Sequence, residues 1–173
     1  MREIEFRAKT VKGGQWIQGD MFRAGTEPSD GEFAISYWDD EDGWMNENVQ
    51  PKTIGQFTGL VDKNGIRIFE GDILRVKEFE NLLMQEFSDD SNRFDLFTIE
   101  EVKGKLNTEY VTPVVWHDGC YDVSTNGAYF DMWIASIFGD MKRSSPLFEF
   151  EVIGNIYDNA ELIPHALLSY IDL

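Results

Sequence analysis

Hydrophobic and polar residues alternate with a period of two over much of the chain, which is the pattern of strands with one buried face. In the first segment Ile4, Phe6 and Ala8 fall on one face and charged residues fall on the other. Gly13-Gly14 then interrupts the pattern before a second stretch that contains Trp and Ile. The N-terminal residues are therefore predicted to form a β-hairpin.

Two further hairpins are predicted from turn residues that separate apolar stretches. The acidic run from Asp39 to Asp42, followed by Gly43, lies between two pairs of large apolar residues and predicts a strand, a solvated tight turn and a return strand. Asn64-Gly65 predicts a hairpin closed by a type I′ turn, which needs positive φ at both central positions. A turn over residues 70–72 then leads into another predicted strand.

The period changes in the middle of the chain. Starting at Phe79, apolar residues recur at i, i+3, i+4 and i+8, which predicts a short amphipathic helix over residues 78–87. Thr98 and Glu101 have the spacing of a capping box, so a second helix is predicted over residues 98–106.

The last third of the chain returns to strand-like patterns. A strand is predicted over residues 111–116, and Pro113 favours an edge position for it because proline has no N–H to donate. Residues 128–138 are apolar at nearly every position, so periodicity does not separate a buried helix from a strand, and their length favours a helix. Residues 147–157 alternate again.

Composition and charge describe a folded and very acidic protein. The 173 residues include 42% hydrophobic and 14% aromatic residues, which is unlike a disordered chain, and the formal net charge is −17. Residues 24–50 carry eight acidic and no basic residues, and residues 78–110 carry nine acidic and three basic ones. A net field of this sign repels both nucleic acid and anionic membranes, so direct binding to either is not expected.

Four segments stand out together in the order in which they occur. They are Ile4-Glu5-Phe6-Arg7-Ala8, Thr58-Gly59-Leu60 with Asp62-Lys63-Asn64-Gly65, Phe69-Glu70-Gly71-Asp72-Ile73-Leu74, and Glu151-Val152-Ile153-Gly154-Asn155-Ile156-Tyr157. In this order the chain resembles the YopX family, small proteins of bacteriophages and prophages. The resemblance spans residues 4–162. It implies a β-rich fold whose C-terminal part is similar to an SH3-like barrel, a phage or prophage origin, and no established biochemical activity.

Together these patterns predict a mainly β (β-rich α+β) protein, an SH3-like barrel or roll of antiparallel strands with a few short helices. Residues 1–55 are expected to form an N-terminal β-hairpin region, residues 56–163 the barrel region, and residues 164–173 a tail. The segment at about 78–110 is interpreted as a helical acidic insertion that the family usually lacks. Ala160 stands where the family commonly has proline.

Few residues offer chemistry. A thiol beside an imidazole can act as a nucleophile, but His117 and Cys120 are three residues apart, a spacing that places strand residues on opposite faces. Asp118-Gly119 between them is ordinary turn chemistry, so a structural role is favoured. Together with His165 they are too few and too scattered for a zinc site.

The acidic run from Asp39 to Asp42 also suggests calcium, but it fails the EF-hand pattern. Aligning Gly43 to the sixth position of that loop puts Trp38 first and Val49 twelfth, where Asp and Glu are required. A solvated turn is the favoured interpretation, with a loose calcium or magnesium site as the alternative. Nucleotide-binding, hydrolase and zinc-protease motifs are absent from the sequence. No cofactor, metal or enzymatic activity is predicted; a carboxylate-based site is the only chemical alternative.

The aromatic residues have two interpretations. Tryptophan is common both in cores and at partner surfaces. The favoured interpretation assigns all five tryptophans to the core and barrel packing, and the alternative assigns them to a ligand groove or partner surface. The apolar run over residues 128–138 exceeds what one helix face buries, which predicts a subunit interface. Its members are Tyr129, Phe130, Trp133, Ile137 and Phe138.

The leading functional hypothesis is a non-enzymatic phage accessory protein that acts through protein contacts as a homo-oligomer. A second hypothesis is an acidic nucleic-acid mimic that binds a basic host protein through Asp39, Asp40, Glu41, Asp42, Asp89 and Asp90. A third is weak nucleic-acid binding through the barrel, using the sparse set Lys52, Lys63, Arg67, Arg75 and Lys77.

The expected location is the cytoplasm of a bacterial host. The N-terminus has no apolar signal region, a span of about 20 apolar residues is lacking, and a single cysteine cannot form an internal disulfide.

Overall fold

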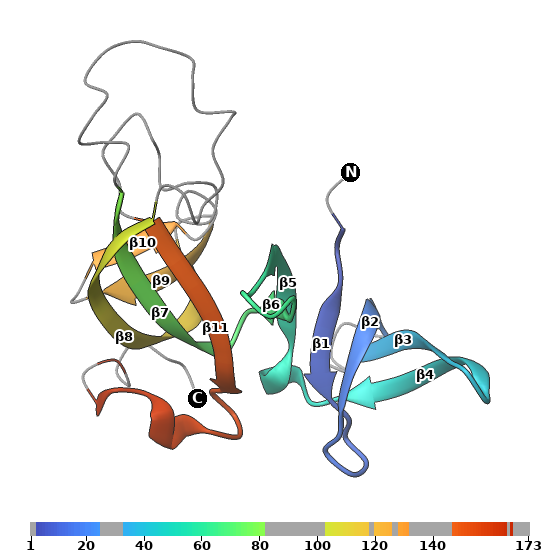
Figure 1. Cartoon of the computed structure of the whole chain (residues 1–173). Coiled ribbons are helices and arrows are strands. Elements are labelled where there is room, and N and C mark those ends of the chain that lie inside the picture. Colours follow the sequence, from blue (N-terminus) through green and yellow to red (C-terminus); the bar gives the residue numbers. More distant parts are fainter. Residues whose placement is uncertain are drawn as a thin grey trace.

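The structure is a computed structural model that describes residues 3–24, 33–81, 103–117, 120–125, 128–131, 147–165 and 167. Two antiparallel sheets and two short 3₁₀ helices make up its regular structure (Figure 1). The expectation of a mainly β protein with a few short helices is therefore confirmed.

The first sheet has six strands in the order β4-β3-β2-β1-β5-β6. Neighbouring strands are antiparallel throughout, and the isolated bridge between Thr10 and Val49 brings the end of β4 back to the end of β1. The strands are β1 (Phe6–Lys9), β2 (Trp16–Arg23), β3 (Phe33–Asp39), β4 (Gly43–Val49), β5 (Gly55–Val61) and β6 (Arg67–Phe69).

The second sheet has five strands in the order β10-β9-β8-β7-β11 and curls into a barrel-like roll (Figure 1). Its strands are β7 (Asp72–Asn81), β8 (Lys103–His117), β9 (Cys120–Thr125), β10 (Ala128–Asp131) and β11 (Leu147–Asn155). The helix η1 (Pro51–Thr53) precedes β5, and η4 (Ala160–Leu162) follows β11.

Period-two alternation gives the β1–β4 part of the first sheet an apolar inner face. Ala8, Ile35 and Val49 are buried together on the inner face. Because successive strand residues point to opposite faces, the alternate positions on β2, β3 and β4 face outward. This outer face carries the groove described below.

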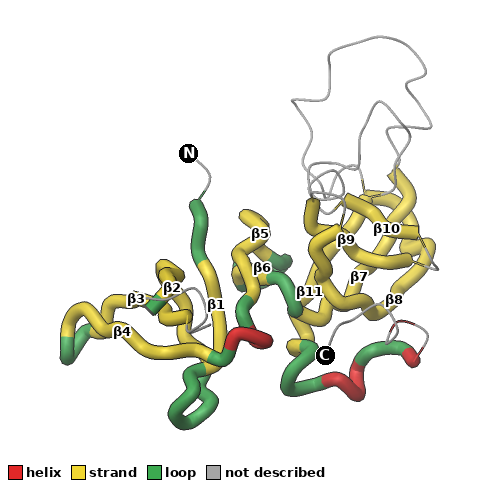
Figure 2. Tube along the Cα trace, turned by 180° about the vertical axis from the view of Figure 1, so that it is seen from behind, coloured by secondary structure: helices red, strands yellow, loops and turns green. Residues whose placement is uncertain are grey.

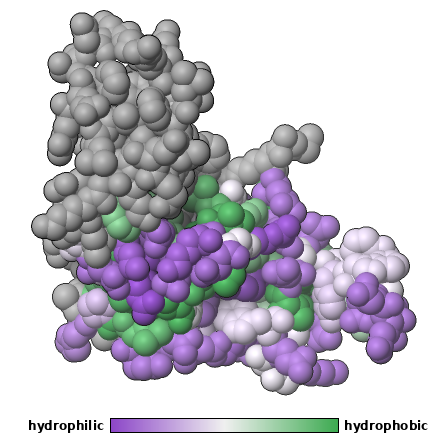
Figure 3. All heavy atoms as spheres, in the orientation of Figure 1, coloured by the Kyte–Doolittle hydropathy of each residue, from purple (hydrophilic) through white to green (hydrophobic). Residues whose placement is uncertain are grey.

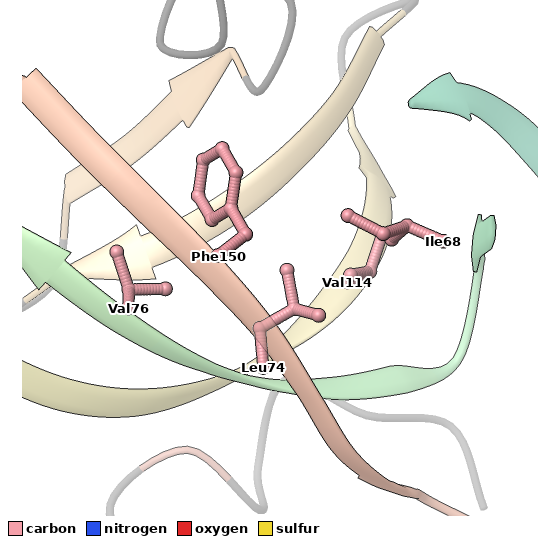
Figure 4. Packing of buried hydrophobic residues seen from close by; sticks show 5 residues of the cluster. All are labelled: Ile68, Leu74, Val76, Val114 and Phe150. Atoms are coloured by element: carbon pink, nitrogen blue, oxygen red, sulfur yellow. The ribbon is translucent and has the colours of Figure 1, made fainter. Parts of the chain in front are cut away.

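The β5–β6 hairpin joins the two sheets. It is hydrogen-bonded to β1 through the register pair Phe6 and Gln56, and it lies between β1 and β11 in both views (Figures 1 and 2). Yet Ile68 of β6 packs into the interior of the barrel against Leu74, Val114 and their neighbours (Figure 4). One hairpin therefore extends the first sheet and fills the core of the second.

The two helices predicted in the middle of the chain are wrong where the structure describes them. Residues 78–81 belong to β7 and residues 103–106 to β8, and the two strands pair with each other. The register shifts between Glu78 and Phe79, and again between Phe79 and Asn81. Such bulges break strict alternation in the described part of β7. Residues 82–102 lie outside the described residues.

The helix favoured over residues 128–138 is also wrong at its start. Residues 128–131 form β10, which pairs with β9, while residues 132–138 lie outside the described residues. The run is ambiguous because nearly every position in it is apolar, so neither the helical nor the strand period stands out.

The predicted hairpin at Asn64-Gly65 is confirmed, but its turn differs from type I′. The N–H of Gly65 donates to the carbonyl of Asp62, and the N–H of Asp62 donates to the carbonyl of Ile66. The loop therefore has three residues and ends on Gly65 at φ +80°.

Pro113 lies in an internal strand, contrary to the predicted edge position. It pairs with Ile73 of β7, while the register with β9 starts one residue later, at Val114. The missing N–H therefore falls just before the β9 pairing begins.

Candidate binding groove on the first sheet

Two exposed tryptophans stand beside each other at the tip of the β3–β4 hairpin. Trp38 and Trp44 are register partners, and their rings meet edge to face with centroids 5.8 Å apart and an interplanar angle of 81°. They are 61% and 66% exposed. The turn between them is held by Asp39, whose carboxylate accepts hydrogen bonds from the N–H groups of Glu41 and Asp42. These bonds hold the pKa of Asp39 below its ordinary value, against a small opposing effect of burial.

The tryptophan pair forms one wall of a groove of about 490 Å³ on the outer face of the sheet. Gly19 lies in it because the backbones of β2 and β3 approach closely there: a Cβ at Gly19 would lie 2.1 Å from the carbonyl oxygen of Ser36. The groove is lined by Glu3, Ile4, Glu5, Trp16, Ile17, Gln18, Gly19, Asp20, Ser36, Tyr37, Trp38 and Trp44.

The groove is negatively charged. Among its described lining residues are three carboxylates and no Lys, Arg or His. Glu3 and Glu5 share an ion pair with Arg67 of β6, which lies outside the lining. Asp20 is exposed and takes part in none of the ion pairs found between described residues.

Trp16, in another part of the lining, is held by residues of β1 and of the turn that follows β11. The Arg7 guanidinium lies 4.8 Å and the Lys9 ammonium 5.5 Å from the centroid of its ring. Its Nε1–H donates to Asp158 at 2.7 Å, and Lys9 pairs with the same carboxylate. Hydrogen bonds from Lys9 and Trp16 lower the pKa of Asp158. Trp16 therefore has a hydrogen-bond acceptor and two cations of the chain itself as partners.

A buried ion pair fastens the groove side of the first sheet to the second. Arg7 donates to Asp72 at 2.7 Å, and the Asp72 carboxylate, 1% exposed, also accepts the N–H of Phe69 at 2.8 Å. Burial raises the pKa of Asp72, while the charge of Arg7 opposes that shift. The Arg7 guanidinium lies 4.7 Å from the Phe69 ring as well as over Trp16, so it is sandwiched between aromatic faces.

The favoured core interpretation of the tryptophans is wrong for three of them. Trp38, Trp44 and Trp116 are all more than half exposed, Trp16 is partly buried, and Trp133 lies outside the described residues. The alternation of residues along β3 indicates the exposure of Trp38. Ile35 is a core residue, so Trp38, three positions on, belongs to the opposite face.

The other predicted surfaces are only partly described. Tyr129 and Phe130 lie in β10, whereas Trp133, Ile137 and Phe138 of the proposed interface lie outside the described residues. Of the acidic contact surface, residues 39–42 form and flank the turn beside the tryptophans, and residues 89–90 lie outside the described part of the chain.

His117 and Cys120 are register partners at the facing ends of β8 and β9, so they belong to two paired strands. The i, i+3 argument assumes one continuous strand and does not apply to them. Within the described ranges, no group of three His, Cys, Asp or Glu side chains is placed to hold a metal ion.

Four of the five residues in the proposed basic cluster make ion pairs with glutamates. Because each of these four positive charges has a carboxylate close by, the cluster presents little free positive charge to a phosphate backbone. Lys63 pairs with Glu149 and Glu151, Arg67 with Glu3 and Glu5, Arg75 with Glu109 and Glu151, and Lys77 with Glu109.

Two antiparallel sheets joined by a shared hairpin, with an open groove on the outer face of the first, define a small all-β protein. A family model described as YopX protein matches residues 5–164, and the chain belongs to the YopX family. A crystal structure of protein EF1440 from Enterococcus faecalis is similar at 19% sequence identity, with 95% of this chain and 100% of that chain covered and a TM-score of 0.43. The comparison with curated proteins found no match. No helix among the described residues has the length and apolar character that crossing a bilayer requires.

Proposed function

We propose that this YopX-family protein is a non-enzymatic accessory protein of a phage or prophage, and that it acts by binding other protein chains through the groove on its first sheet. The observation that carries the proposal is the exposure of Trp38 and Trp44 at the rim of that groove. Tryptophan dominates the energetic centres of protein interfaces, where it supplies a large apolar area and a polar N–H.

The area available at the pair is sufficient to anchor a partner. Covering the exposed parts of two tryptophans removes roughly 200–300 Å² of surface from water, given that one such side chain buries at most about 250 Å². At about 25 cal/mol per Å² this contributes roughly 5–7 kcal/mol before the costs of association. Ile4, which is 62% exposed on the same groove, adds to the apolar surface.

The surroundings of the pair give it specificity. In Figure 3 hydrophobic atoms gather over the body of the molecule, whereas the lobe on the β3–β4 side is purple and white. An aromatic anchor within a hydrophilic rim is the usual anatomy of an interface that forms and dissociates.

Affinity capture with matched variants tests the proposal. We expect Trp38→Ala/Trp44→Ala to lose proteins that the wild type retains from the extract of a bacterium carrying this gene. Trp116→Ala, which removes a similarly exposed tryptophan from the second sheet, serves as the control and should retain them. Identical sets of captured proteins for all three would refute the proposal.

Self-association is the second part of the proposal, and the outer edge of β4 supports it. Within the described part of the chain β4 pairs only with β3, apart from contacts of residues 48–49 with residues 10–11. An open edge of this kind pairs readily with a second copy. Static light scattering at micromolar concentration tests this, and a mass equal to one chain would refute the proposed homo-oligomer.

A further inference from the structure

We infer that the groove binds an arginine of an extended segment of another protein, with the guanidinium against the Trp38–Trp44 pair and in ionic contact with Asp20. The inference rests on the proposed function and names the chemistry of the partner. It is argued from the charge of the groove, from the register of its strands and from the way the chain holds its own Arg7.

Charge complementarity selects a cation. The described lining carries three carboxylates without a basic residue, and the turn beside it adds four acidic residues between Trp38 and Gly43. Arg67 neutralises part of the charge of Glu3 and Glu5. The carboxylate of Asp20 is available to a partner, because none of the ion pairs found between described residues includes it. Phosphate-bearing partners are repelled by the same field.

The strand register places the aromatic pair and this carboxylate within reach of one side chain. Asp20 faces Ser36 across β2 and β3, and Trp38 lies two residues further along β3 on the same face. Diagonal neighbours of this kind are about 7–8 Å apart between backbones, a span that a long side chain bridges. A guanidinium stacked on the indole can thus direct N–H groups to the carboxylate.

The same arrangement exists, already filled, elsewhere in the molecule. Arg7 lies between the rings of Trp16 and Phe69 and pairs with Asp72. The chain therefore holds one guanidinium between aromatic faces and beside a carboxylate. At Trp38 and Trp44 the aromatic faces and a nearby carboxylate recur, but among the described residues no Arg or Lys lies over either ring.

The size and openness of the site favour a peptide segment over a single small cation. A volume of about 490 Å³ is within the range that holds a drug-sized ligand and far exceeds one guanidinium. Gln18 and Ser36 on the lining supply neutral polar groups that suit a peptide backbone. The occupant is therefore a short extended stretch of chain that carries the arginine.

Isothermal titration with three end-blocked peptides provides the test. The first is a nine-residue peptide of alternating Thr and Arg, the second replaces each Arg with citrulline, an uncharged isostere, and the third replaces each Arg with Lys. We expect the citrulline peptide to bind at least tenfold more weakly than the Arg peptide, and the Lys peptide to fall between them. Raising the salt concentration should weaken the binding of the Arg peptide.

Variants locate the binding. Trp38→Ala/Trp44→Ala should weaken the binding of the Arg peptide at least tenfold, and Asp20→Asn should weaken it at least threefold. Trp116→Ala should leave the affinity for this peptide unchanged. All these positions are exposed, and a thermal melt of each variant verifies folding. Equal affinity for the Arg and citrulline peptides, or unchanged affinity in the double tryptophan variant, overturns the inference. Free arginine binding as tightly as the peptide would overturn the assignment to a peptide segment.

The outcome separates this inference from the proposed function. If no peptide binds while the double tryptophan variant still loses captured proteins, the groove binds proteins by other chemistry. In that case only the assignment of an arginine to the groove is wrong. If the captured sets are also identical, both proposals fail.

Discussion

Asp62 fixes the β5–β6 turn and docks it onto β11, and replacing it with asparagine tests that role. Asp62 is 5% exposed. Its Oδ1 accepts the N–H groups of Asn64 at 2.8 Å and Ile66 at 2.9 Å, and its Oδ2 accepts the N–H of Val152 at 3.0 Å. Three backbone donors thus converge on one carboxylate.

The size of the effect follows from this geometry. An asparagine has one oxygen, so if that oxygen keeps the two turn bonds, its NH₂ group faces the N–H of Val152. Losing a hydrogen bond to a charged group costs about 1.5–3 kcal/mol. We expect Asp62→Asn to lower the free energy of unfolding by that amount at pH 7, mainly through the contact between the β5–β6 turn and β11.

The loss should depend on pH. Burial raises the pKa of Asp62, but the hydrogen bonds from Ile66, Val152 and Asn64 outweigh it and the net pKa is lowered. Below about 3.9, its ordinary value, the unfolded chain binds the proton more readily than the folded one. The stabilisation by Asp62 is therefore complete above that value and is lost as the pH falls through the lowered folded pKa.

Urea unfolding of the wild type and of Asp62→Asn from pH 7 to pH 3 measures this. The midpoint difference should be largest at pH 7, with unchanged m-value, and should narrow below about pH 4. Asp40→Asn, in the exposed turn of the first sheet, is the control and should unfold like the wild type at pH 7. A difference that is zero at pH 7, or the same at every pH, would show that the carboxylate does not hold the turn.

Two further predictions concern the groove and its anchorage. Arg7→Ala should destabilise the protein by about 3–5 kcal/mol because it leaves the buried charge of Asp72 unpaired. In urea unfolding, the double change Arg7→Ala/Asp72→Ala should cost less free energy than the sum of the two single changes. Additive costs would mean that the two residues are not coupled. Gly19→Ala should lower the free energy of unfolding by about 1–3 kcal/mol because the new Cβ collides with the carbonyl of Ser36. Thermal melts measure this, with Gln18→Ala as a control that should have little effect. A melting temperature of Gly19→Ala equal to that of the wild type would contradict the close approach of the strands.

Part of the first sheet could be predicted from the sequence because its apolar and polar residues alternate and turn residues mark its hairpins. Alternation from Ile4 to Ala8 and the acidic turn after Trp38 located β1 and the β3–β4 hairpin to within a few residues. Where the ladder is interrupted, the prediction failed. The bulges around Phe79 disturbed the alternation of β7, and the pairing of this strand with residues more than 20 positions later leaves no local signal.

The groove was harder to foresee than the strands. Residue type alone assigns Trp38 and Trp44 to the core, although the alternation of β3 relative to Ile35 places Trp38 on the outer face. The close approach at Gly19 depends on how β2 and β3 pair in space, which the composition of neither strand encodes. The negative charge, by contrast, was evident from the eight acidic residues in 24–50.

The shared β5–β6 hairpin has a consequence for how the molecule comes apart. If β1 detaches, β5 loses its pairing with β1 at Gln56. The β5–β6 hairpin, which carries Ile68 into the barrel interior, is then less firmly held. Melting of either sheet therefore undermines the other, so heat should remove both in one cooperative transition. Fragments cut between η1 and β5 would each expose a surface that the intact chain covers, and the halves would be poor candidates for separate expression.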